Sequence, residues 1–147
     1  MLTSLLVAML LGMVLGVERF LAHKTAGMRT YTLVSMGSAM FVIISQIVTA
    51  QHPGGTFDPL RIAAQVVAAA GFLGVGAIIH HDQRVSGITT ASGLWVAAGI
   101  GMAAGFGLYR IAIIVTILSL FTFIVMWFLE AKIRKISALQ IDENKPL

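Results

Sequence analysis

Charged side chains gather at the ends of long apolar runs, and these clusters are where the sequence could support chemistry. Glu18 and Arg19 close the first run, Lys24 and Arg29 follow shortly, and Arg84 lies in a later connection. A carboxylate at a membrane edge is unfavourable unless it is paired or hydrated. Basic side chains at helix N-termini can hold an anion such as a phosphate or a lipid headgroup, or they can hold Glu18. The alternative readings are interfacial anchoring of Glu18 and Arg19 and a plain positive-inside signal for the others.

Within this cluster we expect Glu18 to pair with Arg29. A guanidinium–carboxylate contact is bidentate, strong and directional. Arg29 also precedes the second apolar run, where the dipole of a helix N-terminus favours a carboxylate. The same membrane edge should contain Thr89 and Thr90, in the first turn of the fourth run, where hydroxyls commonly cap the helix or bond nearby carbonyls.

Four further side chains invite a metal-site interpretation: His23, His80, His81 and Asp82. Imidazole and carboxylate groups suit zinc and similar ions. However, the spacing fits no standard zinc site, and two adjacent histidines at a helix end would point apart. We therefore expect a solvated loop, with no metal and no cofactor.

The motifs of common enzyme classes do not occur in this chain. It contains no cysteine, so thiolate chemistry and disulfides are excluded. No nucleophile–base pair, phosphate-binding loop or dinucleotide fingerprint is present. The glycines of Gly71-x-x-Gly74-x-Gly76 lie inside an apolar run and indicate packing. We expect a protein that is not an enzyme.

The elements that position these residues must be membrane helices. Of 147 residues, 58% are hydrophobic and 11% are charged, against about 25% charged in soluble domains. The net charge of +4 would suggest nucleic acid in a soluble protein. In a membrane protein, basic residues instead mark the cytoplasmic side, so we expect no nucleic-acid partner.

Five apolar runs approach the roughly 20 residues that a bilayer span requires. The predicted fold is therefore all-α, a polytopic bundle of about five transmembrane helices. The last two runs are separated by three residues and form an antiparallel hairpin. The runs cover residues 2–17, 31–50, 60–79, 88–107 and 111–129.

The basic residues predict the orientation of this bundle. If five spans are crossed, eight of the ten lysines and arginines fall on one side, and only Arg61 and Arg110 fall on the other. The positive-inside rule then places the N-terminus outside and the C-terminus in the cytoplasm. Residues 1–130 form the transmembrane domain, and residues 131–147 form a short basic cytoplasmic tail.

Small residues predict which helices pack closely. In the fourth run a small residue recurs every four positions, which places the four on one helix face. Such faces let helix backbones approach in lipid. The fifth run lacks glycine, so we expect runs one to four to form a close bundle and the fifth to be more lipid-exposed. A homodimer is the expected assembly. The predicted packing residues are Gly12, Gly16, Gly71, Gly74, Gly93, Ala97, Gly101 and Gly105.

Five stretches of the sequence, taken together and in order, resemble the MgtC/SapB family of bacterial membrane proteins. Each stretch is short, but together they cover most of residues 12–107. They are Gly12-x-x-x-Gly16-Val17-Glu18-Arg19, His23 to Val34 (HKTAGMRTYTLV), Gly71 to Ile78 (GFLGVGAI), Arg84 to Trp95 (RVSGITTASGLW) and Gly101 to Gly107 (GMAAGFG).

The resemblance implies a multi-pass protein of the bacterial inner membrane. It implies a role in growth under magnesium limitation, in acid adaptation and, in pathogens, in survival inside host cells. It also implies a non-enzymatic regulator that inhibits the proton-driven ATP synthase, and it covers the membrane domain only, without the soluble C-terminal domain of longer members. The polar site that it implies comprises Glu18, Arg19, Lys24, Arg29, Thr30, Arg84, Thr89 and Thr90.

A transporter or channel for an ion or a small anion is the alternative function. Intramembrane glycines and interfacial charges support it. Against it, the centres of the runs contain no acidic residue, whereas transporters usually keep their ion site near the midplane. We therefore expect a regulator or adaptor that meets the bilayer, a second copy of itself and another membrane protein.

Overall fold

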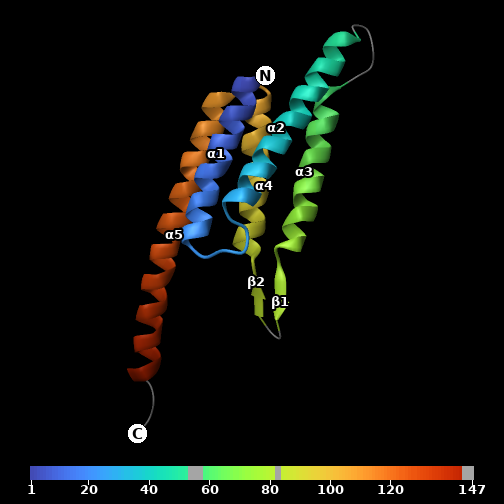
Figure 1. The fold of residues 1–147 in the computed structure, drawn as a ribbon. Helices are drawn as coiled ribbons and strands as arrows, with labels where there is room; N and C mark the ends of the chain where they lie inside the picture. The colour runs from blue at the N-terminus through green and yellow to red at the C-terminus, as the bar shows by residue number, and fades with distance from the viewer. Residues whose placement is uncertain (53–57, 82–83, 144–147) are drawn as a thin grey trace.

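The chain folds into five helices and one short β-hairpin (Figure 1). The computed structural model describes residues 1–52, 58–81 and 84–143, and side chains for all of these except 79–81, 84 and 134–143. All five helices are long and apolar enough to cross a membrane, as the sequence predicts. The elements are α1 (Leu2–Leu21), α2 (Met28–Gln51), α3 (Pro59–Gly76), β1 (Ile79–His81), β2 (Arg84–Ser86), α4 (Ile88–Gly105) and α5 (Tyr109–Glu143).

Helix α2 lies between α1 and α4, and the three helices cross closely at Ser35. This residue is fully buried, and its hydroxyl donates a 2.8 Å hydrogen bond to the Ala8 carbonyl of α1. A Cβ at Gly12 would come within 2.8 Å of the Ser35 Cβ, and a Cβ at Gly101 within 2.8 Å of the Ser35 Cα. Glycine at both positions therefore allows three backbones to meet at one residue, which is the close approach that small residues permit in lipid.

Helices α3 and α5 flank this three-helix core. In the apolar membrane-spanning stretch of α4, half of the residues are buried within the chain. The corresponding share is only 17% in α3 and 11% in α5. Helix α5 is therefore the least buried of the five helices within the described chain, in keeping with the expectation for the fifth run. Helix α3 is the next least buried, although it packs against α4 and α2, so the most buried part of the bundle consists of α1, α2 and α4. The reason is that α3 buries only three positions: Val66, Ala70 and Gly74.

The connection between α3 and α4 contains an antiparallel β-hairpin that the sequence analysis did not predict. The third run was expected to stay helical through residue 79, but α3 ends at Gly76, and Ile79 pairs with Ser86 instead. Gly87 then joins β2 to α4 with φ +90°. A Cβ there would collide with the Ala77 carbonyl, and a left-handed conformation suits glycine, so this junction requires glycine.

The basic residues gather at one end of the bundle, which we call the basic end. The α1–α2 loop, the β-hairpin and the C-terminal part of α5 all lie there (Figure 1). Arg61 lies in the first turn of α3 and Arg110 in the first turn of α5, both at the opposite end. Residues 131–143, expected as a tail, continue α5 as helix, and Lys145 lies outside the described residues. The charge asymmetry therefore exists in space as well as in sequence.

Candidate functional site

A buried arginine occupies the basic end of the core. The Arg19 side chain is only 3% exposed, and its guanidinium forms a bidentate ion pair with Glu18, the preceding residue. The Nη2 atom donates to Glu18 Oε1 at 2.6 Å, and Nε donates to Oε2. The Glu18 side chain is 16% exposed. The pair is neutral overall, and the attraction between the two charges offsets part of the desolvation cost of burying the guanidinium.

Aromatic side chains from two other helices complete the surroundings of Arg19. Its guanidinium carbon lies 3.7 Å from the ring centroid of Phe123 on α5, a cation–π contact. The Tyr31 hydroxyl of α2 donates a 3.2 Å hydrogen bond to the Thr90 carbonyl of α4. A Cβ at Gly93 would clash with the Tyr31 hydroxyl and lie 3.0 Å from Phe123 Cζ. Gly93 therefore makes room for both rings.

The end of α1 directs the following loop toward this site. His23 adopts φ +53°, the left-handed conformation that often ends a helix. The His23 amide donates to the Phe20 carbonyl, and the Lys24 amide donates to the Arg19 carbonyl, both at 3.0 Å. These two bonds form a Schellman motif. The motif places Lys24 beside the cavity that Arg19 also lines.

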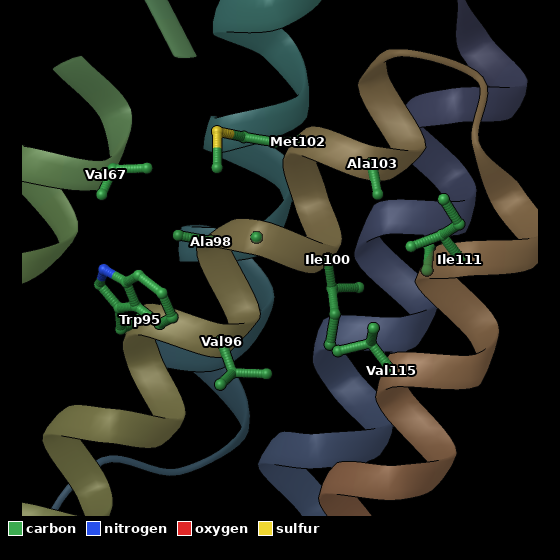
Figure 2. Close-up of a pocket in the computed structure, with 11 residues that line it drawn as sticks. Val67, Trp95, Val96, Ala98, Ile100, Met102, Ala103, Ile111 and Val115 are labelled. Atoms are coloured by element: carbon green, nitrogen blue, oxygen red, sulfur yellow. The ribbon is translucent and has the colours of Figure 1, made fainter. Parts of the chain in front are cut away.

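Two cavities lie along the outer side of α4. The first, of about 550 Å³, opens at the basic end between α4 and α5 and is lined by Arg19, Lys24 and Thr89 among others. The second, of about 260 Å³, lies farther along α4 and is almost wholly apolar. Figure 2 shows its walls on α3, α4 and α5. Val96 and Val115 line both cavities, and the two neighbouring cavities are together named here the α4 trough.

The structure brings together part of the predicted polar site. Glu18, Arg19, Lys24 and Thr89 meet at the basic end of the α4 trough or beside it. Thr90 is 2% exposed and offers its carbonyl to Tyr31, so it belongs to the α2–α4 packing.

The other predicted site residues lie apart from this group or cannot be placed. Arg29 and Thr30 are exposed at the start of α2. The expected Glu18–Arg29 pair is not formed, because the long Arg19 side chain folds back onto the neighbouring carboxylate and satisfies both oxygens. The side chain of Arg84 and the sequence 82–83 lie outside the described residues, as do the side chains of His80 and His81.

Most of the predicted packing residues lie against another helix, but Gly71 does not. Those of α1 and α4 contact α2: a Cβ at Gly16 would lie 2.6 Å from the Met28 Cα, and one at Gly105 would lie 2.9 Å from the Ala39 carbonyl. Ala97 is fully buried. A Cβ at Gly74 would lie 3.4 Å from the Ala91 Cβ. A Cβ at Gly71 would meet no atom of another element within 4 Å, so Gly71 lies on the outer side of α3 and does not serve packing within the described chain.

Sequence reasoning missed what α5 contributes. It treated this helix as lipid-facing, yet α5 supplies Phe123 to Arg19 and forms one wall of the α4 trough. The available signal was a polar series at helical spacing, Ser119 and Thr122, followed by Glu130, all of which line the trough. Phe123 itself gave no signal, because the helix contains many apolar residues. Among the described residues, no three His, Asp or Glu side chains come together as a metal site.

Comparisons with known proteins match the membrane part of the chain. The model of a family described as the MgtC family matches residues 5–132. A protein of Escherichia coli K12 named "Putative magnesium transporter YhiD" is 40% identical over 111 residues, which cover 72% of this chain and 51% of that protein. No solved structure gives a significant match.

Proteins named MgtC are also similar. The one from Brucella abortus strain 2308 is 45% identical over 85 residues, covering 58% of this chain and 34% of that protein. The one from Salmonella typhimurium LT2 is 43% identical over 89 residues, covering 60% of this chain and 36% of that protein. The chain therefore spans between a third and about half of the length of these relatives.

Proposed function

Since the chain belongs to the MgtC family, we propose that it is a non-enzymatic regulator of the bacterial inner membrane that acts on a partner membrane protein. The physiological setting would be adaptation to low magnesium or to acid. The proton-driven ATP synthase is the partner to test first, and a homodimer is the proposed assembly. Because the chain spans only part of its curated relatives, the proposal concerns the membrane part that they share with it.

The observation that carries this proposal is the contrast between a closed core and an open site at the basic end. The faces of α1 and α4 that meet α2 leave no room even for one added carbon at Gly12, Gly16 or Gly101. At these three positions the packing leaves no space between α2 and its two neighbours. The polar groups instead line the open trough at the basic end, beside the lipid-facing helix α5. A surface of that kind suits a partner in the membrane.

The acidic residues support a regulator over a magnesium transporter, the alternative that the name of the E. coli relative suggests. Magnesium binds oxygen ligands, usually including carboxylates. None of the six acidic residues lies in the central part of a span, and Glu18 is already paired with Arg19. The six are Glu18, Asp58, Asp82, Glu130, Asp142 and Glu143.

Magnesium flux and partner inhibition separate the two functions. Proteoliposomes with a trapped magnesium indicator should show no entry above that of protein-free vesicles. Inverted membrane vesicles carrying the chain should show reduced ATP-driven proton pumping, and Glu18→Gln at equal abundance should restore it. Saturable magnesium entry that Glu18→Gln abolishes would establish the transporter instead. Pumping that is unaffected by the wild-type chain would remove the ATP synthase as the partner.

The basic end is proposed to face the cytoplasm, because the positive-inside rule places lysine and arginine there. A fluorescent protein fused after Leu147 should glow, and alkaline phosphatase fused at the same point should be inactive. As the matched control, phosphatase inserted after Tyr109, at the opposite end, should be active. The reverse pattern would invert the bundle and place the site outside.

A further inference from the structure

We propose that the α4 trough binds one phospholipid, with its phosphate at Arg19 and Lys24 and an acyl chain along the outer side of α4. The ligand would occupy the site on which the proposed regulatory function rests. Lipid binding is measured separately from partner inhibition, so one can fail without the other.

The first argument is a spare donor edge on a buried arginine. Glu18 takes the Nε and Nη2 sides of the Arg19 guanidinium. Among the described residues, every fully buried side-chain nitrogen and oxygen has a hydrogen-bond partner, whereas Nη1 has no partner there. Arg19, whose side chain is 3% exposed, is one of the residues that line the cavity. A guanidinium edge of this kind suits a phosphate oxygen.

The second argument is charge. Glu18 cancels the charge of Arg19, so Lys24 supplies the attraction for an anion at the mouth of the trough. Glu130 also lines the mouth, and its negative charge opposes the attraction that Lys24 exerts on an anion there. Basic residues at this depth are where a phospholipid headgroup lies.

The third argument is the shape and chemistry of the rest of the trough. From Ile88 at the mouth to Val96 the helix rises about 12 Å, close to the roughly 15 Å depth of one leaflet. Beyond Val96 the walls are apolar (Figure 2). The two cavities, of about 260 and 550 Å³, match small-ligand sites of about 300–1,000 Å³. Free phosphate would leave the apolar part of the trough unused.

The two tryptophans of the chain provide the assay, because Trp95 and Trp127 both line the trough. The purified chain in detergent is titrated with phosphatidylglycerol brominated on its acyl chains, and tryptophan quenching is followed. Quenching should saturate, and native mass spectrometry should show one bound lipid per chain. Unbrominated phosphatidylglycerol should reverse the quenching, whereas inorganic phosphate and diacylglycerol should not.

Variants test each end of the trough with matched controls. Lys24→Gln should weaken binding about fivefold, and Arg29→Gln, which removes an equal charge from the same end, should not. Val115→Phe should weaken binding roughly tenfold by filling the junction of the two cavities. Ile117→Phe, on the exposed side of the same helix, should not.

Four results would overturn the proposal. Equal binding by Val115→Phe and Ile117→Phe would reduce the lipid to general solvation of the helices. Displacement by inorganic phosphate would make the site one for free anions, and equal competition by diacylglycerol would remove the role of the phosphate. A lipid-free dimer that Val115→Phe converts to a monomer would show that a second copy covers the trough.

Discussion

Helix α4 presents two faces that use small residues for opposite purposes. Toward α2, Gly101 and Gly105 bring backbones into contact, and Gly93 leaves no space beyond that which the Tyr31 and Phe123 rings fill. Toward α3 and α5, Gly99 has no neighbour within 4 Å and lines the trough. The same residue type thus closes one interface and opens the other. What a glycine does in a membrane helix is decided by the surface opposite it.

The largest effect should come from filling the closed face. Gly101→Leu places a side chain against the Ser35 backbone, and we expect a loss of at least about 3 kcal/mol in the free energy of unfolding. Size-exclusion chromatography in detergent after heating measures it. Gly99→Leu is the matched control and should elute as wild type. If Gly99→Leu were equally damaging, the contrast between the two faces would fail.

The next largest effect should come from breaking the ion pair beside the open face. Arg19→Gln leaves the Glu18 carboxylate unpaired, at a cost of about 2–3 kcal/mol. Adding Glu18→Gln should recover part of this loss, because the two residues act as one unit. Arg29→Gln should stay within about 0.5 kcal/mol of wild type. Chemical unfolding in detergent measures the wild type, the two single variants and the double variant. If Arg29→Gln were also destabilising, Arg29 would have to be counted as part of the site.

A smaller effect should come from the single hydrogen bond that joins α2 to α4 beside the site. Tyr31→Phe removes the donor to the Thr90 carbonyl and should cost about 1 kcal/mol. Tyr109→Phe removes a 2.9 Å bond to Ser4 at the opposite end of the bundle, where headgroups can replace it, and should cost less. Thermal unfolding of the two variants side by side ranks them. If Tyr109→Phe cost more stability than Tyr31→Phe, the stronger hydrogen bond would be the one to Ser4, away from the closed face.

The smallest effect should come from the turn that delivers Lys24 to the trough. His23→Gly removes the strain of a left-handed side-chain-bearing residue and should stabilise the chain by about 0.5 kcal/mol. His23→Val should destabilise it by about 1 kcal/mol. Thermal unfolding provides the measurement. Equal stability of the two variants would mean that this turn does not fix the position of Lys24.

The sequence predicts the helices and the closed face well, because both depend on short-range patterns. Apolar runs reveal spans, and a small residue every fourth position reveals the α4 face that meets α2. Gly71 shows the limit of this reasoning: it has the same residue type in the same kind of helix, yet it faces outward. Only the three-dimensional arrangement decides which side of α3 has a neighbour.

The site was predictable only in part, because its geometry depends on side-chain paths and on a distant helix. Glu18 and Arg19 were expected in it, but their mutual pairing was not, since adjacent helical side chains usually diverge and only the length of arginine allows the return. Phe123 comes from more than a hundred residues away. The β-hairpin is three residues per strand, too short for an alternating pattern to be recognised.

The placement of α2 between glycines of α1 and α4 has a consequence for motion. Backbones that touch on both sides leave α2 no alternative position, and its hydrogen bonds are shielded from exchange. Local opening should therefore begin in the thinly buried helices α3 and α5, in keeping with the low stability of segments that make few buried contacts. Amide hydrogen exchange should be slowest around Ser35.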